Sequence, residues 1–290
     1  MPETMTALFG GTGPDWTVRQ VPVPQPGYEF AGEVAAVGDG VDTPAVGDRV
    51  MGTTPESFAQ FVLADHRHMV TIPAGLGYED ASALPTGLLT EHGAMMTGGF
   101  RVGQSLLITG ATSSIGLIGV QIAKALGARQ VIATTRSAGK RELLEGAGAD
   151  VVVVTSEQNL TEAVLDATGG DGVDLVLDHV AGQTFADCLP ATHVDGVVVN
   201  IGRLDKAEST IDIDALSYRH LRVFGVSFGF TRAAELGAVL SAAADQVGTA
   251  VSEGHVRALV DSTYSLEDAA PAAARLRSHQ AHGKIVLTVP

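Results

Sequence analysis

The segment ITGATSSIG, residues 108–116, is a glycine-containing turn between a strand-like and a helix-like stretch. The preceding SLLITG (105–110) is typical of a buried strand, and the following IGLIGVQIAKALGA (115–128) is typical of an apolar helix that ends in glycine. A dinucleotide-binding turn requires this context, because backbone amides at the start of the helix can hold a pyrophosphate. We therefore expect a dinucleotide to contact Gly110, Thr112, Ser113, Ser114, Ile115 and Gly116.

Alternating strands and helices continue beyond this turn. Five further strand-like runs follow, nearly all of them continuous apolar stretches, which is typical of a parallel sheet covered on both faces. They are QVIATT (130–135), DVVVVT (150–155), VDLVLDHV (173–180), GVVVNIG (196–202) and LRVFGVSFG (221–229). The pattern predicts an α/β fold with a doubly wound, Rossmann-type domain over residues 98–230.

The residues on either side of this domain show a different pattern. The first 97 residues contain the strand-like pieces YEFAGEVAAV (28–37) and FAQFVLA (58–64), separated by Gly, Pro and Asp, and predict a small, mostly β unit. The stretch between them, VGDGVDTPAVGDRV, consists of turn signals. After residue 230 we expect a helix at 233–247, a strand at 256–266, an Ala-rich helix and a final strand at 283–289.

Composition and charge limit the class of protein. The chain has 290 residues, of which 45% are hydrophobic, and this favours a folded α/β protein over a disordered chain. A net charge of −15 argues against a nucleic-acid partner. The single cysteine, Cys188, excludes an intrachain disulfide and a zinc site built on several thiolates. Without a signal-peptide pattern or an apolar run of about 18 residues, we expect a cytoplasmic protein that does not enter the membrane.

The end of the second predicted strand indicates which nicotinamide the turn would bind. NAD sites usually have Asp or Glu there, which accepts hydrogen bonds from the ribose 2′-hydroxyl. Here Thr135 is followed by Arg136 and Ser137, with Lys140 one helical turn further on. The two cations would attract the 2′-phosphate of NADPH. We predict that these four residues bind NADPH; the alternative is that both cations are solvated residues at a helix start.

Two reductase families have a turn of this kind. Short-chain reductases place it near the N-terminus and need a Tyr-x-x-x-Lys pair, but none of the four tyrosines here has lysine four positions later. The chain instead resembles the zinc-independent quinone oxidoreductase and enoyl reductase branch of the medium-chain dehydrogenase/reductase superfamily. The resembling segments are VRQVPVPQPG (18–27), PGYEFAGEVAAVGDGV (26–41), VGDRVMG (46–52), LLITGATSSIGLIGVQIAKALGA (106–128), KRELLEGAGAD (140–150), TGGDGVDLVLDHVAG (168–182), VDGVVVNIG (194–202) and HGKIVL (282–287).

The resemblance implies an organisation in two domains. Residues 1–97 and 231–290 would form a GroES-like catalytic domain around the NADP-binding domain at 98–230. The chain would be a homodimer whose sheets join edge to edge, here through 223–228. In the family a few tens of residues separate VPVPxPG from PGxEFAG, whereas Pro26-Gly27 serves both stretches in this chain. We therefore expect a shortened catalytic domain with an open active-site cleft.

The resemblance also bears on metal binding. Zinc-dependent relatives have Gly-His-Glu where this chain has Gly27-Tyr28-Glu29, so we expect no catalytic metal. His66 and His68 lie two residues apart on a strand-like piece without obvious further ligands, and we interpret them as a surface pair.

Further site residues are implied by position in the family. Asn200, Ile201 and Gly202 end the fifth predicted strand and would border the nicotinamide ribose. Ser227 and Phe228 belong to the segment that closes over the ring, and Lys284 lies near the cofactor in relatives.

Three residues are candidates for catalysis. Tyr28, at the position where relatives bind zinc, could donate its hydroxyl to a substrate oxygen, or could be a packed tyrosine. Thr90 corresponds to a threonine near the nicotinamide end. His92 occupies the place of a tyrosine and is either a proton donor or a histidine on a helix surface.

These features predict an NADPH-dependent oxidoreductase with a small-molecule substrate. It would reduce an activated carbon–carbon double bond, in an enone or a quinone, by hydride transfer to the β-carbon, with donors for the developing enolate. Two alternatives stay open. The chain could be a biosynthetic cyclase or isomerase whose enlarged cleft holds a bulky substrate while NADPH is idle or absent, or it could be a non-catalytic NADPH-binding protein.

Overall fold

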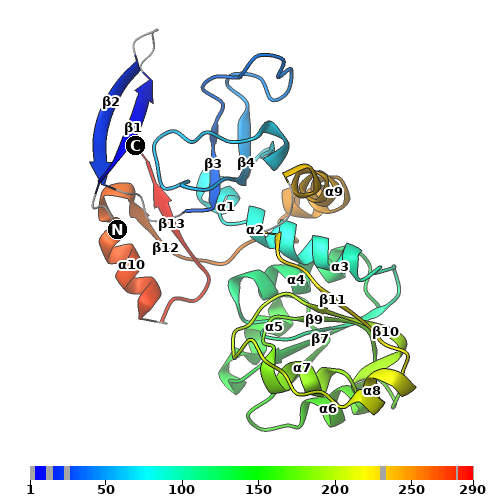
Figure 1. Cartoon of the computed structure of the whole chain (residues 1–290). Coiled ribbons are helices and arrows are strands. Elements are labelled where there is room, and N and C mark those ends of the chain that lie inside the picture. Colours follow the sequence, from blue (N-terminus) through cyan, green and yellow to red (C-terminus); the bar gives the residue numbers. More distant parts are fainter. Residues whose placement is uncertain (1–3, 11–15, 23–26, 229–232, 279, 290) are drawn as a thin grey trace.

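A parallel six-stranded sheet with helices on both faces forms the larger part of the computed structural model, which describes residues 4–10, 16–22, 27–228, 233–278 and 280–289 (Figure 1). The strand order is β11-β10-β9-β6-β7-β8, and every neighbouring pair is parallel. The predicted doubly wound fold is confirmed. The strands are β6 (Ser105–Ile108), β7 (Gln130–Thr135), β8 (Val151–Val154), β9 (Val173–Asp178), β10 (Thr192–Asn200) and β11 (Arg222–Gly225).

Two apolar cores cover the two faces of this sheet. Because side chains alternate along a strand, Leu106 and Ile108 point to one face and Leu107 to the other, and each of the three is fully buried. The first face packs against α4 (Ser114–Ala125) and the second against α6 (Leu160–Ala167) and α7 (Gly182–Cys188). Shorter helices are η3 (Ala138–Lys140), α5 (Arg141–Gly146) and α8 (Ile213–Tyr218).

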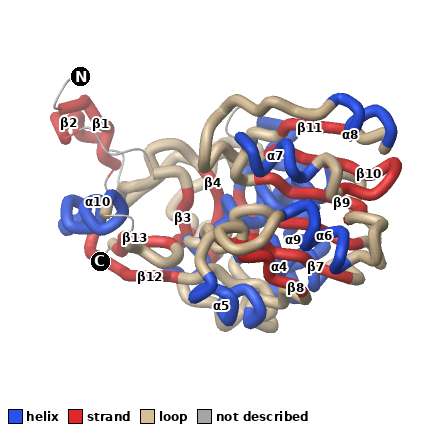
Figure 2. Tube along the Cα trace, turned by 90° about the horizontal axis from the view of Figure 1, so that it is seen from below, coloured by secondary structure: helices blue, strands red, loops and turns tan. Residues whose placement is uncertain are grey.

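Smaller β units flank the parallel sheet. An antiparallel sheet contains β3 (Glu29–Glu33), β4 (Arg49–Thr53) and β5 (Met69–Thr71), and a separate hairpin pairs β1 (Thr4–Gly10) with β2 (Trp16–Pro22). The C-terminal strands β12 (Val260–Ser265) and β13 (Lys284–Thr288) pair in parallel around η5 (Leu266–Asp268) and α10 (Ala269–Arg277). In Figures 1 and 2 these N- and C-terminal units lie at the same end of the molecule. The domain bounds at 97/98 and 230/231 stay a prediction.

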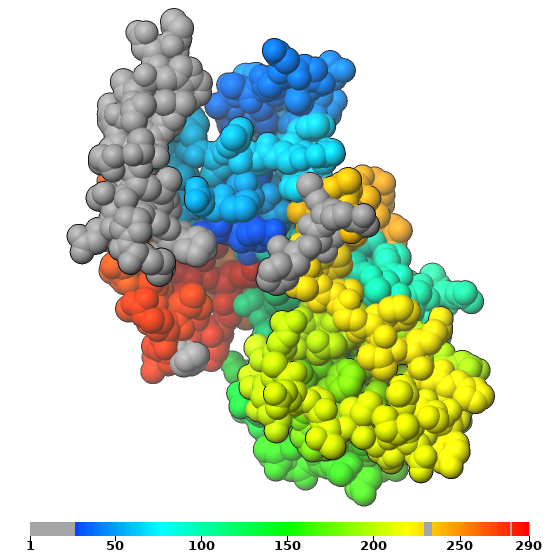
Figure 3. All heavy atoms as spheres, in the orientation of Figure 1, coloured from blue at the N-terminus to red at the C-terminus, as the bar shows by residue number. Residues whose placement is uncertain are grey.

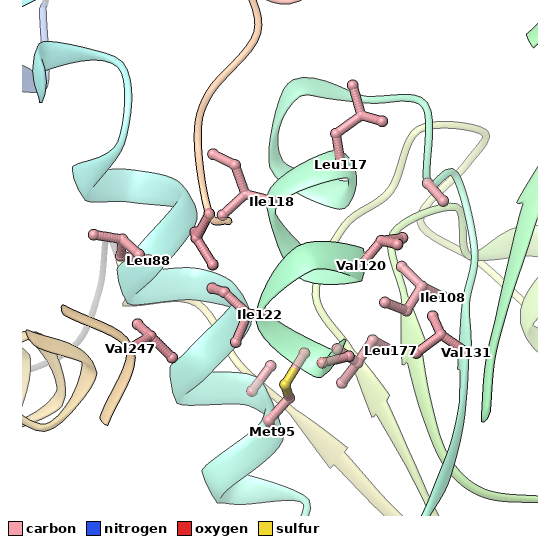
Figure 4. Packing of buried hydrophobic residues seen from close by; sticks show 14 of the residues in the cluster. Leu88, Met95, Ile108, Leu117, Ile118, Val120, Ile122, Val131, Leu177 and Val247 are labelled. Atoms are coloured by element: carbon pink, nitrogen blue, oxygen red, sulfur yellow. The ribbon is translucent and has the colours of Figure 1, made fainter. Parts of the chain in front are cut away.

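A run of helices joins the N-terminal antiparallel sheet to the parallel sheet. It consists of α1 (Tyr78–Ser82), α2 (Pro85–Gly87), the π-helical η2 (Leu88–His92) and α3 (Gly93–Thr97), and α9 (Ala233–Ser252) packs beside it. Figure 4 shows Leu88 and Met95 of this run facing Ile118 and Ile122 of α4, with Val247 of α9 close by. The N-terminal part (residues 27–97) is thus attached to the parallel sheet through an apolar helix contact. Figure 3 shows an open notch between the C-terminal segment, orange to red, and the lobe of the parallel sheet, green to yellow.

Three local predictions for the N-terminal part are wrong. FAQFVLA (58–64) forms bends instead of a strand, and Phe61 and Leu63 are 71% and 95% exposed. A strand needs a neighbour to satisfy its backbone groups, and none of the described strands pairs with this segment. His66–His68 form a short 3-10 helix, η1, rather than part of a strand. Conversely, β4 begins at Arg49, inside a stretch that we interpreted as turns, because Arg49 pairs with Glu33 of β3.

Within the described ranges, no helix combines the length and the apolar character that crossing a bilayer requires.

We predict that Ile118→Ala destabilises the whole protein. Ile118 is fully buried between α4 and the α2–η2 run, so its truncation leaves a cavity and should cost about 2–5 kcal/mol. Urea denaturation measures this change. Val102→Ala, at a position that is 80% exposed, is the control and should change stability by less than about 0.5 kcal/mol. Equal effects for the two variants would contradict the packing described above.

Candidate active site

The glycine turn after β6 is shaped for an anion. Gly110 has φ +58°, and a Cβ at Gly116 would lie 2.8 Å from the Cα of Ala111, so both positions need glycine. The Ser113 hydroxyl accepts a hydrogen bond from the Gly116 amide at 3.0 Å. Ser114 begins α4 and does not have a positive φ, so its side chain is accommodated without backbone strain. The first amides of a helix have no partner within it and can hold a pyrophosphate.

A buried carboxylate lies where the carboxyl ends of β6, β9 and β10 meet. Asp178 ends β9, is fully buried and accepts hydrogen bonds from the Thr109 hydroxyl at 2.7 Å and from Asn200 Nδ2 at 2.9 Å. It also accepts one from the Ala181 amide at 3.0 Å. Asn200 donates in addition to the carbonyl of Gly202 at 3.0 Å. Asp178 thus ties the carboxyl ends of β6, β9 and β10 together and places 200–202 beside the glycine turn.

Ala181 has a strained backbone in this network. Its φ of +61° and ψ of −153° lie in a region that is populated essentially by glycine. Backbone strain of this kind persists where surrounding contacts over-determine it, and it clusters at functional sites. Here both oxygens of Asp178 accept hydrogen bonds from the Ala181 amide and fix its orientation.

The end of β7 presents two cations. Thr135 is buried and its hydroxyl accepts a hydrogen bond from the Ser137 amide at 3.2 Å. Arg136 is exposed and Lys140 is half-buried at the end of η3. Neither cation has an ion pair or a hydrogen bond with the described residues, whereas Arg141 donates to the carbonyl of Val152 at 3.0 Å. Both charges are therefore available to an external anion.

Two of the three catalytic candidates lie on η2. Thr90 is 9% exposed, and His92 is fully buried, with its Nε2 3.1 Å from Oε1 of Gln246 on α9. The interpretation of His92 as a residue of a helix surface is wrong, because α9 covers it. Burial lowers the pKa of His92, although the hydrogen bond to Gln246 opposes this change. Tyr28 precedes β3 and is 36% exposed.

Glu29 connects Tyr28 to two other elements. Its carboxylate accepts a hydrogen bond from the Thr86 amide at 2.8 Å, at the start of α2, and pairs with the ammonium group of Lys284 on β13. Lys284 therefore lies next to the Tyr28 segment, and its contact with a cofactor stays a prediction. Phe228, after β11, packs against Gly93 and Val239, so this segment reaches the helix that carries Thr90.

Our sequence analysis missed one buried ionic pair near the crevice. Nε2 of His179, directly after β9, lies 3.1 Å from Oε1 of Glu91 on η2. It also missed Asp178. Two signals in the sequence could have identified these residues. One is the polar pair Asp178-His179 at the carboxyl end of a parallel strand, and the other is a single acid inside the apolar run LLTEHGAMM.

The described part of the chain contains no group of three or more His, Cys, Asp or Glu side chains that could hold a metal ion.

Family models match both parts of the chain. Residues 114–245 match the zinc-binding dehydrogenase family, and residues 5–100 match the alcohol dehydrogenase GroES-like domain.

Similar proteins include reductases of known structure. Mycobacterial Rv1454c, solved in complex with NADPH, is 30% identical with a TM-score of 0.78, and the match covers 91% of this chain and 82% of that one. A quinone oxidoreductase from Pseudomonas syringae is 27% identical with a TM-score of 0.78, over 91% and 81% of the two chains. A 2-haloacrylate reductase is 27% identical with a TM-score of 0.80, over 92% and 84%.

A longer curated relative is also similar. Erythronolide synthase EryA2 of Saccharopolyspora erythraea is 35% identical over 268 residues. The match covers 91% of this chain but spans only 7% of the length of EryA2.

We predict that Ala181→Gly stabilises the protein. Relief of strain of roughly 1–3 kcal/mol outweighs the loss of about 0.4–1 kcal/mol from the freer unfolded chain, which leaves a gain of about 1 kcal/mol. Urea denaturation measures it. In the control, Ala186→Gly in the interior of α7, the same substitution should instead cost up to about 1 kcal/mol. A loss of stability in both variants would show that Ala181 is not strained.

Proposed function

Since this chain belongs to the medium-chain dehydrogenase/reductase superfamily, in its zinc-independent quinone oxidoreductase and enoyl reductase branch, we propose that it is an NADPH-dependent reductase of an activated carbon–carbon double bond. The substrate class would be an enone or a quinone. One observation carries the proposal: a glycine turn and two cations without a partner among the described residues lie at the carboxyl ends of neighbouring strands of a doubly wound sheet.

The residues of the crevice fit an NADPH molecule. The Gly110–Gly116 turn would hold the pyrophosphate, Arg136 and Lys140 the 2′-phosphate, and Asn200–Gly202 the nicotinamide ribose. When bound, the reduced nicotinamide supplies a hydride. The similarity to an NADPH-bound mycobacterial structure supports this choice of cofactor.

The protein would contribute mainly positioning and hydrogen bonding. Tyr28 is partly exposed, so its hydroxyl can donate to the oxygen of the substrate, where negative charge develops as the β-carbon gains a hydride. Thr90 would lie at the nicotinamide end. His92 is buried against Gln246, so we propose that it fixes η2 and does not deliver a proton to the substrate. The similarity to a quinone oxidoreductase and a 2-haloacrylate reductase supports an electron-poor double bond as the substrate.

We predict that Arg136→Ala and Lys140→Ala each weaken NADPH binding about tenfold and leave NADH binding unchanged. A hydrogen bond between charged groups contributes roughly 1.5–3 kcal/mol, and only NADPH carries the 2′-phosphate. Titration followed by nicotinamide fluorescence measures both affinities. The control is Arg129→Ala, which removes an exposed cation at the opposite end of β7.

The outcomes separate the proposal from its rivals. Equal affinity for both nucleotides, or no binding, would contradict the NADPH assignment. Tight NADPH binding without NADPH oxidation by any enone or quinone would favour a non-catalytic binding protein, and product formation without NADPH consumption would favour a cyclase or isomerase.

We also propose a homodimer that forms through the edge strand β11. Val223 and Phe224 are 44% and 40% exposed on this edge. A twofold interface buries the same edge of both copies, so Val223→Glu would bury a carboxylate on each side of it and should yield monomers. Light scattering after gel filtration measures the mass. Val102→Glu, at an exposed position beside Gly127, should stay dimeric, and a Val223→Glu variant that is still a dimer would refute this interface.

A further inference from the structure

Glu91 and His179 form a buried ionic pair between the joining helices and the parallel sheet. Oε1 of Glu91 lies 3.1 Å from Nε2 of His179, and their side chains are 0% and 6% exposed. The two residues come from η2 and from the end of β9, so folding of the whole chain brings them together.

The surroundings of this pair are shaped for a carboxylate. A Cβ at Gly119 of α4 would collide with the Glu91 carboxyl group, so glycine leaves the space that this group occupies. In the described part of the chain, no hydrogen bond of ordinary geometry reaches either oxygen of Glu91 or Nε2 of His179. The cost of removing these two groups from water is therefore offset by their mutual attraction.

The pKa of His179 reflects these contacts. Burial opposes protonation, but the carboxylates of Glu91 and Asp178 outweigh it and raise the pKa of His179 above its ordinary value. These two acids are the charged groups that act on the ring from η2 and β9. His92, the other titratable side chain of η2, contacts Gln246 through its Nε2, and burial lowers its pKa.

Such a buried pair contributes little to the free energy of unfolding. Removing two charges from water usually costs as much as their attraction returns, so apolar residues of similar size would contribute as much to the free energy of unfolding. Unpartnered buried polar atoms and perturbed ionisation are more common at functional sites. A π-helical turn, as in η2, is also frequent there.

The pair lies directly beside the residues of the proposed cofactor site. The His179 amide donates to the Thr109 hydroxyl at 3.0 Å, and its carbonyl accepts from the Leu204 amide at 3.1 Å. Glu91 is the neighbour of Thr90 on η2. The ion pair therefore connects the helix that carries Thr90 to the strand end that carries Asp178.

We propose that Glu91 and His179 are positioning residues, whose ion pair holds η2 and Thr90 against the nicotinamide end of the crevice. This role rests on the reductase function proposed above. Because the folded pKa of His179 is raised, protonation of its ring persists above the ordinary histidine pKa, and the pair is lost as the pH rises through the raised value. The Glu91 charge is then buried without a counterion, and η2 must shift to hydrate it.

Kinetics across about pH 5 to 9 test the role, with an enone as acceptor. In the wild type, kcat should fall at high pH with one ionisation. In Glu91→Gln no ion pair can form, so kcat should be about tenfold lower at neutral pH and the high-pH limb should be absent. The Kd for NADPH should change less than about threefold, because the turn and the two cations are intact.

A size-matched apolar pair separates positioning by charge from simple packing. The double variant Glu91→Met/His179→Phe should unfold at the same urea concentration as the wild type, yet have a low kcat without the high-pH limb. Full recovery of kcat in this variant would overturn the proposal and leave the pair a packing role. The control is Lys124→Gln, which removes a surface ion pair with Asp150 from α4 and should keep the wild-type profile.

Two readouts do not depend on turnover. Nitrogen NMR of labelled histidines should show that His179, assigned from its loss in His179→Gln, stays protonated on both ring nitrogens to higher pH in the wild type than in Glu91→Gln. The emission of bound NADPH should follow this ionisation in the wild type but not in the double variant. If no acceptor is reduced, the reductase proposal fails while these readouts still decide the pair. An ionisation of His179 that is unchanged in Glu91→Gln, or emission that does not follow the ionisation in the wild type, would refute the positioning role.

Discussion

Hydrogen bonding to one buried carboxylate, Asp178, organises the crevice on which the site depends. Thr109, Asn200 and the Ala181 amide all donate to it, so the carboxyl ends of β6, β9 and β10 have a fixed spacing. The glycine turn leaves the sheet at β6, and the residues expected at the nicotinamide ribose leave it at β10. A carboxylate buried without these donors would be costly, so this network also explains how Ala181 keeps a backbone conformation that disfavours alanine.

The N-terminal part contacts the elements around Asp178 through two different kinds of interaction. Apolar side chains of η2 and α3 pack on α4, and this packing fixes the distance between the N-terminal part and the parallel sheet. These side chains carry no charge. Ionic contacts then connect particular elements: Glu29 joins β3 to α2 and β13, and Glu91 joins η2 to the end of β9. Apolar packing and ionic contacts between particular elements therefore both connect the N-terminal part to the rest of the chain.

The N-terminal part contains a segment whose composition and structure disagree. FAQFVLA has the composition of a strand, but none of the described strands lies beside it, and its apolar side chains are exposed. A strand is stable only where a neighbour satisfies its backbone groups, and this condition depends on residues elsewhere in the chain. In the parallel sheet, by contrast, each apolar run has a neighbour on at least one side, so composition and structure agree.

The sequence by itself determined the order of strands and helices, the glycine turn and the cations after β7, because these features depend on residues that are close together in the chain. It also indicated the family, through several segments with fixed spacing. Only the tertiary structure showed that α9 buries His92, that Lys284 pairs with Glu29, and that Asp178 and Glu91 have partners far away in sequence. Burial and ionic pairing arise where elements distant in the chain meet, and local patterns do not specify those contacts.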